Sequence, residues 1–139
     1  MDQELHELSK EVYRRHPDWT STGYIYYQNR HYKALQGDYD VYAEGYAYDM
    51  TNGYTADFEP ERGDIPLYSC DYLLARLPKK FREKGTTYWV EVSPMDMNTW
   101  GACYAEDRDD ELKHFVYSDT PLKALLKLTI ALDDAGVTL

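Results

Sequence analysis

The sequence predicts an α+β protein, with an antiparallel sheet, N-terminal, central and C-terminal helices packed on it, and a tyrosine-rich β-hairpin insertion. Apolar residues recur at helical spacing near both ends of the chain. Short β-prone runs separated by turn residues fill the segment 86–118, and tyrosines with turn signals fill 23–61. The length of 139 residues predicts a single domain spanning 1–139, with one hydrophobic core.

A short amphipathic helix is expected over about residues 2–15. Asp2 can cap its start, and Pro17 marks the point by which the helix has ended. Its apolar positions recur at helical spacing and are Leu5, Leu8 and Val12.

About three strands are expected between residues 24 and 58. Turn signals stand at Gln36-Gly37 and at Asn52-Gly53, and the second is the stronger signal for a tight hairpin. The segment 24–35 does not alternate cleanly between apolar and polar residues, so it is compatible with a strand or a helix.

A central helix is expected to begin with Ser69 as its N-cap, to be kinked or restarted at Pro78, and to end at Gly85. A loop rich in Pro, Gly and charged residues, 59–66, precedes it. Its apolar positions are Leu73, Leu74 and Leu77.

Three β-prone runs follow, and their spacing predicts an antiparallel meander packed beneath the last helix. They are TTYWVEV (86–92), TWGACYA (99–105) and KHFVYS (113–118).

The last helix, over 121–135, has the clearest start and stop signals in the chain. Thr120 is placed as N-cap, Pro121 at the first helical position, and Gly136 as the C-terminal stop. Its apolar residues cover more than one narrow stripe, which indicates burial against a sheet.

Three features of residues 66–136 carry a family resemblance: Pro66-Leu67-Tyr68-Ser69-Cys70-Asp71, similar to a P-x-Y-S-x-D helix opening, Asp119-Thr120-Pro121-Leu122, and Trp100 in a short strand. On these residues the C-terminal half resembles the phage α/β/α-sandwich domain, a family of small phage and prophage proteins. The resemblance implies an accessory gene of a phage or prophage and an α+β fold, and it implies no reaction. The segment 23–61 has no counterpart in the family pattern.

The charge balance argues against general nucleic-acid binding and against binding to anionic membranes. Asp and Glu number 25 against 15 Lys and Arg, which gives a formal net charge of −10. The hydrophobic fraction of 43% is typical of a packed domain. The N-terminus lacks the positive charge and apolar run of a signal peptide, so the expected location is the cytoplasm of a host cell.

The longest charge asymmetry lies in residues 38–61, which contain no Lys or Arg. If 38–49 is a strand, alternation places acidic and tyrosine side chains on one face. Tyrosine is enriched at interface hot spots, so this face is a candidate surface for a basic partner; a solvated strand face is the alternative. The candidate partner-binding residues are Asp38, Asp40, Tyr42, Glu44, Tyr46, Tyr48 and Asp49.

Partial mimicry of DNA is one form that such binding could take. Duplex DNA as long as a twelve-residue strand, about 40 Å, carries about 23 charges. The strand supplies four acidic residues, so mimicry needs further acidic segments, of which 106–111 is the clearest.

No metal or cofactor is expected. The acidic run 106–111 resembles a calcium loop, but Leu112 and Ser118 stand where an EF-hand needs Gly and Glu, which favours a hairpin turn. No glycine-rich phosphate loop occurs. No zinc-binding spacing links the four histidines, His6, His16, His31 and His114.

We expect no enzymatic activity, because no motif assembles a nucleophile, a base and an orienting group. Cys70 or Cys103 with His114 is the one pairing available for nucleophilic catalysis. Reduced thiols are expected at both cysteines. A basic patch is interpreted as a solvated helix end, or else as an anion-binding or self-association surface, and consists of Arg76, Lys79, Lys80, Arg82 and Lys84.

The leading hypothesis is a phage or prophage accessory protein that acts by stoichiometric protein binding. Its expected target is a basic host protein or nucleoprotein complex, such as a nucleic-acid-handling defence complex, which would make the chain anti-CRISPR-like. A small-ligand-binding module with a pocket beneath the tyrosine-rich strands is the alternative, and a small hydrolase comes third. A homo-oligomer is compatible with either hypothesis.

Overall fold

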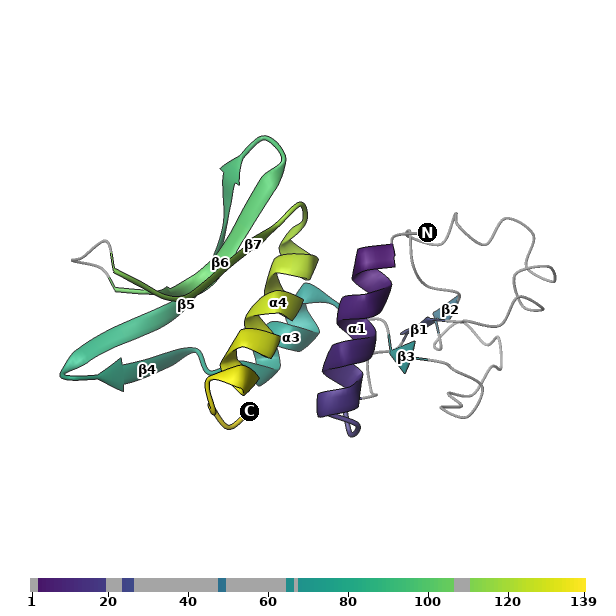
Figure 1. The fold of residues 1–139 in the computed structure, drawn as a ribbon, viewed down its shortest axis with the longest axis horizontal. Helices are drawn as coiled ribbons and strands as arrows, with labels where there is room; N and C mark the ends of the chain where they lie inside the picture. The colour runs from purple at the N-terminus through teal and green to yellow at the C-terminus, as the bar shows by residue number, and fades with distance from the viewer. Residues whose placement is uncertain (1–2, 20–23, 27–47, 50–64, 67, 107–110) are drawn as a thin grey trace. The chain divides into compact units, whose positions relative to one another are not determined.

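The computed structural model divides the chain into two compact units, residues 1–68 and 69–139. Helices and an antiparallel sheet confirm the α+β class (Figure 1). The single-domain organisation stays a prediction. The structure describes residues 3–19, 24–26, 48–49, 65–66, 68–106 and 111–139.

The first unit contains a helix and, within its described residues, three short strands. The helix α1 (Gln3–Arg15) confirms the N-terminal prediction. Strands β1 (Tyr24–Tyr26), β2 (Tyr48–Asp49) and β3 (Ile65–Pro66) pair antiparallel in the order β2-β1-β3. Residues 24–26 are therefore extended. Residues 27–35 and the turns predicted at 36–37 and 52–53 lie outside the described residues.

One face of α1 is buried, at Leu5, His6, Ser9 and Val12. Leu5 and Val12 are buried as predicted, and Ser9 lies one helical turn after Leu5 on the same face. The third predicted position, Leu8, is only half-buried. At the C-terminal end of this helix, the side chains of Arg14 and Arg15 both donate hydrogen bonds to Glu11.

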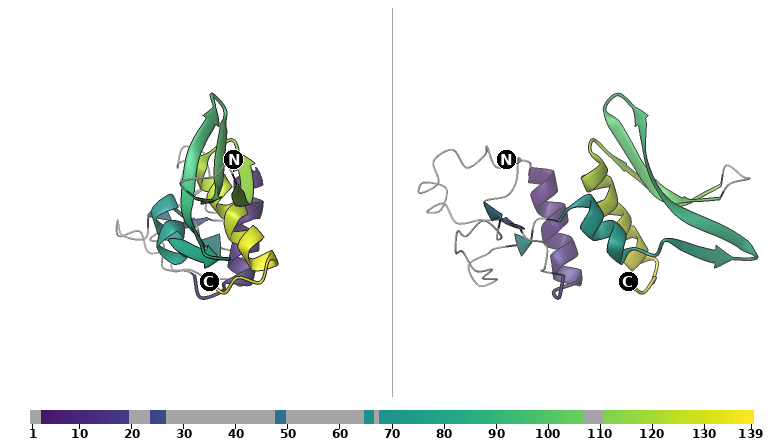
Figure 2. Two further views of the ribbon diagram at one scale, coloured as in Figure 1. Left: turned by 90° about the vertical axis from the view of Figure 1, so that its left-hand side faces the viewer. Right: turned by 180° about the vertical axis from the view of Figure 1, so that it is seen from behind.

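The second unit contains a four-stranded antiparallel sheet in the order β4-β5-β6-β7. Helix α4 (Pro121–Asp134) packs against β5, β6 and β7, and helix α3 (Cys70–Arg76) packs against α4. Figure 2 shows from two further sides that the sheet is curled and that α4 lies along one of its faces. The strands are β4 (Lys80–Glu83), β5 (Thr86–Asp96), β6 (Thr99–Ala105) and β7 (Leu112–Ser118).

The prediction of a central helix running to Gly85 is wrong in its second half. The predicted cap is confirmed, because the Ser69 hydroxyl accepts a hydrogen bond from the Tyr72 amide at 3.1 Å. The helix ends at Arg76, because Leu77 precedes a proline and is extended. Residues 80–83 form strand β4 instead. Lys84 and Gly85 connect it to β5 with φ of 51° and 82°, as a two-residue hairpin turn of type I′ requires.

Helix α4 confirms the predicted boundary signals. The Thr120 hydroxyl accepts a hydrogen bond from the Lys123 amide at 3.2 Å, and Pro121 is the first helical residue. At the other end, the Gly136 amide donates to the Asp133 carbonyl and the Val137 amide to the Leu132 carbonyl. This pair of hydrogen bonds, with φ of 81° at Gly136, is a Schellman motif.

The core of the second unit lies between α4 and the sheet. Ala102 and Tyr104 of β6 are fully buried beneath the helix. The fully buried leucines of α4 are Leu125, Leu126, Leu128 and, in its last turn, Leu132.

The ladder between β6 and β7 contains a β-bulge. Ala102 pairs with Val116 and Tyr104 pairs with Lys113, so two residues of β7 lie opposite Cys103. One of these two residues, His114, adopts a left-handed backbone conformation with φ of 58°. Such a conformation is uncommon for residues other than glycine and accommodates the extra residue here.

Strand β5 extends well beyond its neighbour β4. It pairs with β6 through residues 89–96, but with β4 only through residues 86–89. The Val90 amide points to the β4 side, where it donates to the Lys79 carbonyl at 3.0 Å. Since amides alternate along a strand, the nitrogen of Pro94 lies on that same edge, which has no strand partner among the described residues.

Candidate functional site

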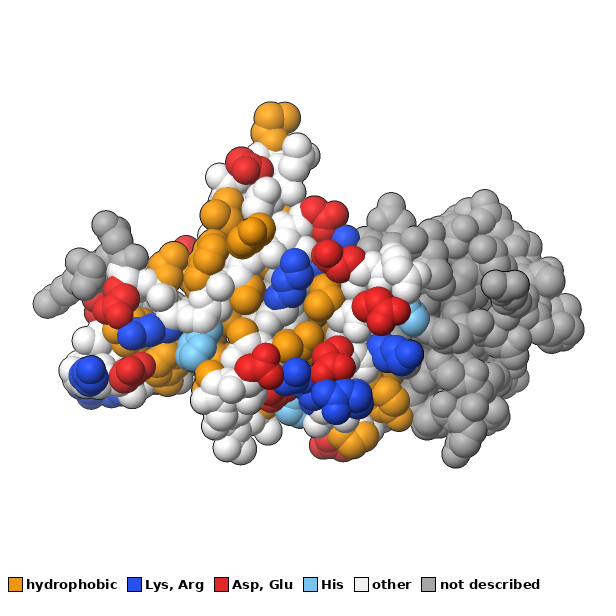
Figure 3. All heavy atoms as spheres, in the orientation of Figure 1, with side chains coloured by type: hydrophobic (Ala, Val, Ile, Leu, Met, Phe, Trp, Pro, Cys, Tyr) orange, Lys and Arg blue, Asp and Glu red, His pale blue; other side chains and the backbone are white. Residues whose placement is uncertain are grey.

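The sheet face turned away from α4 carries large hydrophobic side chains. We call it the outer face and define it by Trp89, Met95, Leu112, Phe115 and Tyr117. Their exposed fractions range from 40% for Phe115 to 62% for Tyr117, with Trp89 at 46%. Figure 3 shows a band of hydrophobic side chains along the projecting hairpin of β5 and β6.

Strand register places these side chains together. Trp89 and Leu112 both pair with Ala105, from opposite sides, and Tyr117 pairs with Gly101. Since paired residues of an antiparallel sheet share a face, these side chains point to one side. Tyr104 precedes Ala105 in β6, and successive side chains of a strand point to opposite faces. Tyr104 therefore points to the other side of the sheet, toward Leu132 of α4.

Gly101 lies at the centre of the outer face. A Cβ atom on Gly101 would lie 3.1 Å from the ring of Phe115 and 3.2 Å from the sulfur of Met95. The missing side chain therefore lets these two residues approach each other over the middle of β6.

The bulge in β7 decides which residues reach the outer face. Lys113 lies on the α4 side with its paired residue Tyr104, and its ammonium group lies 5.6 Å from the ring centre of Tyr88. Without the extra residue, His114 would point outward and Phe115 inward. The bulge reverses this: His114 lines a cavity on the α4 side, while Phe115 and Tyr117 point outward.

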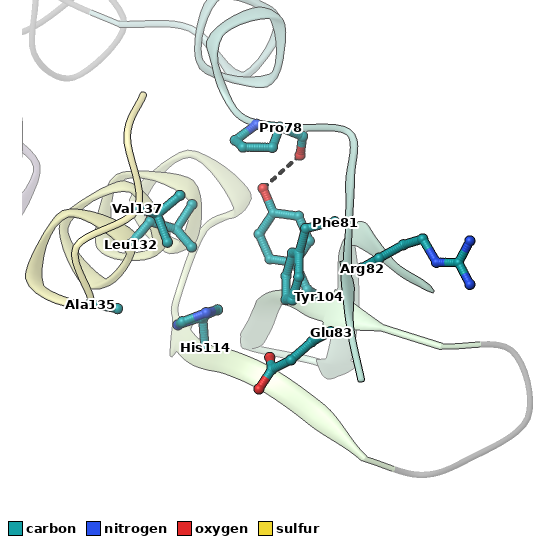
Figure 4. Close-up of a pocket in the computed structure, with 9 residues that line it drawn as sticks. All are labelled: Pro78, Phe81, Arg82, Glu83, Tyr104, His114, Leu132, Ala135 and Val137. Atoms are coloured by element: carbon teal, nitrogen blue, oxygen red, sulfur yellow. Dashed lines mark hydrogen bonds between the residues drawn. The ribbon is translucent and has the colours of Figure 1, made fainter. Parts of the chain in front are cut away.

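That cavity, of about 360 Å³, is the second candidate feature. It is formed by β4, β6, β7 and the C-terminal end of α4, all within the second unit (Figure 4). Its lining residues are Pro78, Phe81, Arg82, Glu83, Tyr104, His114, Leu132, Ala135 and Val137.

Aromatic rings form one wall of the cavity. The Phe81 ring lies 5.1 Å from that of Tyr104 and 6.0 Å from that of His114. The rings of Tyr104 and His114 meet edge to face at 6.4 Å. Phe81 also stacks on Tyr88, with ring centres 5.2 Å apart. These contacts fix the rings in place around the cavity.

Tyr104 is tied to the loop that precedes β4. Its hydroxyl donates a hydrogen bond to the Pro78 carbonyl at 2.6 Å (Figure 4). Burial raises the pKa of Tyr104 to about 12, so the phenol stays protonated at neutral pH. Tyr104 therefore serves as a hydrogen-bond donor and as part of the aromatic wall.

The structure places Cys103 and His114, one of the two cysteine and histidine pairings considered from the sequence, on opposite sides of the sheet. Cys103 alternates with Tyr104 and belongs to the outer side of β6, while His114 lines the cavity on the other side. Burial, with a smaller contribution from Glu91, raises the pKa of Cys103 to about 11. Burial also raises the pKa of Cys70. Both thiols therefore favour the protonated form, which is the weaker nucleophile.

The described part of the chain brings no three His, Cys, Asp or Glu residues close enough to hold a metal ion. Of the histidines it includes, His6 is buried in α1, His16 stacks on Trp19 with ring centres 4.0 Å apart, and His114 lines the cavity. In the acidic run, Glu111 forms an ion pair with Lys113 at 2.8 Å, and residues 107–110 lie outside the described ranges.

The predicted partner-binding residues fall mostly outside the described residues. Tyr48 and Asp49 form β2, paired with β1. The rest of that predicted strand and the ligand pocket predicted beneath it also lie outside. The predicted residues outside the described ranges are Asp38, Asp40, Tyr42, Glu44 and Tyr46.

The basic patch is not the end of a long helix. Arg76 lies in the last turn of α3, where its guanidinium group stacks 3.4 Å from the ring centre of Tyr72. Lys80 and Arg82 lie on β4, and Lys84 lies in the turn that follows. The Lys80 ammonium group lies 5.0 Å from the ring centre of Trp89. Two of the five patch residues, Lys80 and Arg82, therefore lie on an edge strand beside the outer face.

Sequence reasoning missed both the outer face and the cavity. Phe115, Val116 and Tyr117 are consecutive apolar residues. Such a run indicates a strand with apolar side chains on both faces, whereas a strand with one solvated face alternates between apolar and polar residues. Phe81 is the lone apolar residue in a charged run, KKFREK, and so signals a side chain that packs. The bulge at His114 has no comparable signal.

No helix among the described segments is both long and apolar enough to cross a membrane. Comparison of the chain with protein-family models, curated proteins and solved structures found no match.

Proposed function

We propose that the protein acts by stoichiometric binding of one basic protein partner, with the outer face as the contact surface. The observation that carries this proposal is the gathering of five large, partly exposed hydrophobic side chains from β5 and β7 on one sheet face. Large apolar side chains gathered on an exposed face in this way are costly to leave in water and are typical of interaction sites. Trp and Tyr, both present, are residue types that often dominate binding energy.

Charge argues for a basic partner. The chain carries a formal net charge of −10, which attracts positively charged proteins over distances longer than a contact. Long-range attraction would raise the rate of encounter, and the apolar outer face would hold the partner once it is bound.

A host nucleic-acid-handling defence complex is the partner class that we favour. Such complexes present Lys and Arg to phosphate groups, so their binding surfaces are basic. The sequence-based prediction that residues 66–136 resemble the phage α/β/α-sandwich family implies a phage or prophage gene, and from that origin we infer a role against host defence. An inhibitor of this kind needs no catalytic site.

Site-specific photo-crosslinking in host cells tests the proposal. A photoreactive amino acid replaces Tyr117 on the outer face, and in a control chain it replaces Ala75, which is exposed on α3. We expect one predominant basic protein to crosslink through position 117 and not through position 75. Crosslinking only to a second copy of this chain, or no crosslink specific to position 117, contradicts the proposal.

The purified partner then allows a quantitative test. We expect Trp89→Ala and Tyr117→Ala each to weaken binding about tenfold or more, and Ala75→Ser to leave it unchanged. Thermal unfolding of each variant verifies that it is folded. Wild-type affinity in both outer-face variants contradicts the proposed surface, and an affinity independent of salt contradicts the basic partner.

A further inference from the structure

We propose that the cavity formed by β4, β6, β7 and the end of α4 is a binding site for a small organic cation carrying an alkylammonium group. This site is independent of the proposed function, because it lies on the α4 side of the sheet. Three features carry the inference: aromatic rings on one wall, a carboxylate at the opening, and the C-terminal end of a helix on the other wall.

The aromatic wall suits a cation with alkyl substituents. The half-buried rings of Phe81 and His114 line the cavity, and the fully buried Tyr104 ring packs against both, with ring centres 5.1 and 6.4 Å away. The negative faces of aromatic rings attract cations, and clustered rings recognise alkylated ammonium groups in particular, whose methyl groups also bury apolar surface. Phe81 also stacks on Tyr88 with ring centres 5.2 Å apart, a contact that restrains its ring without any ligand.

Glu83 supplies the negative charge. Its carboxylate is turned toward the cavity beside His114 in Figure 4, whereas the Arg82 side chain extends away from it. The Arg82 guanidinium group donates a hydrogen bond to the Gly85 carbonyl at 3.2 Å, in the adjacent turn. The nearby cation Lys113 forms an ion pair with Glu111 at 2.8 Å, and Glu83 contributes to raising its pKa. Glu83 is therefore the charged side chain that faces the cavity.

The helix wall adds to the same potential. Ala135 and Val137 belong to the Schellman end of α4, and the C-terminal end of a helix carries partial negative charge. The last turn of α4 contains no basic residue, and it contains Asp133 and Asp134. Helices often carry basic residues at this end, and the last turn of α4 carries none to offset the partial negative charge.

The size of the cavity limits the ligand. A volume of about 360 Å³ is near the low end of the range for small-molecule sites, roughly 300 to 1,000 Å³. It suits a free alkylammonium compound or the end of a methylated lysine side chain. Both present the same chemical group, so the test includes each source.

The test titrates the full chain with choline and with its neutral isostere, 3,3-dimethylbutan-1-ol, followed by NMR shifts of His114 and Val137. We expect saturable binding of choline and at least about fivefold weaker binding of the alcohol, because the alcohol lacks the charge. Equal affinities for the two probes, or no saturable shift at the cavity, overturn the proposal. A short peptide with trimethyl-lysine distinguishes a protein-derived source, which it would show by binding more tightly than choline.

Variants locate the charge that matters. We expect Glu83→Gln to weaken choline binding about fivefold or more and Glu83→Lys to abolish it. Glu83 is exposed at the end of a strand, so both variants should fold. The matched control is Asp71→Asn, which removes an exposed carboxylate of α3 and should leave the affinity unchanged. Wild-type affinity in Glu83→Lys, or equal losses in Glu83→Gln and Asp71→Asn, overturns the proposal.

Discussion

Cys103 shows how the sheet changes the chemistry of one residue. It is buried on β6 and pairs with Glu91 of β5. Burial and then the Glu91 carboxylate raise its pKa to about 11, against about 8.5 for cysteine in an unfolded chain. The protonated thiol therefore stabilises the folded state below about pH 8.5. This contribution is lost as the pH rises through the folded pKa, because the unfolded chain releases its proton first.

Alkaline unfolding tests this linkage. We expect the free energy of unfolding of the wild type to fall more steeply between pH 8.5 and about 11 than that of Cys103→Ala, because only the wild type has this thiol. Urea unfolding at several pH values measures both. Between pH 6 and 8 the difference between the two proteins should stay constant. A constant difference up to pH 11 would show that the thiol is not shielded.

The absence of a side chain at Gly101 of β6 makes room for Phe115 and Met95 from the neighbouring strands. We expect Gly101→Val to lower the free energy of unfolding by about 1–3 kcal/mol, because its Cβ alone would lie 3.1 Å from Phe115 and 3.2 Å from Met95. Gly101→Ala should cost less than Gly101→Val. In a Met95→Ala background the cost of the valine should shrink. Urea unfolding of the four chains measures this coupling, and an unchanged cost in that background would argue against the contact.

At the level of elements, α4 depends on its N-cap. We expect Thr120→Ala to lower the free energy of unfolding by about 1 kcal/mol, since the Lys123 amide loses its acceptor. Thr120→Ser keeps the hydroxyl and should stay close to wild type. Urea unfolding compares the three proteins, and equal stability of Thr120→Ala and wild type would exclude the cap as a source of stability.

The elements that the sequence predicted are those fixed by local chemistry. Thr120 and Ser69 cap helices through their own hydroxyls, and a glycine such as Gly136 ends a helix through its own backbone freedom. Strands β5, β6 and β7 also follow from local composition. Strand β4 does not, because its residues KFRE have no strand pattern of their own and depend on pairing with β5 and on the packing of Phe81.

The candidate sites were less predictable for a related reason. The bulge at His114 arises from the pairing of β6 with β7, and it alone determines that Phe115 points outward and His114 toward the cavity. The apolar and polar pattern of one strand does not indicate whether that strand has an extra residue relative to the strand it pairs with. The cavity joins residues 78 to 137, so it exists only after the unit has folded.

At the level of the whole molecule, the net charge of −10 should control how fast a partner arrives. We expect Asn or Gln at Asp38, Asp40, Glu44 and Asp49 to lower the association rate and its salt dependence, with little change in dissociation. Ala at Tyr42, Tyr46 and Tyr48 should instead raise the dissociation rate. Surface-binding kinetics at two salt concentrations measure both sets. Unchanged rates in both would remove this acidic face from consideration.

The edge of β5 beyond β4, which has no strand partner among the described residues, bears on how many molecules behave together. An extended strand edge without a partner offers its amides and carbonyls to any other strand, and apolar side chains beside it favour stacking into fibrils. Pro94 lies on this edge and has no amide hydrogen to offer there. The edge is thus interrupted where β5 projects past β4. Pro94 thus hinders polymerisation through the strand edge that lies beside the exposed apolar outer face.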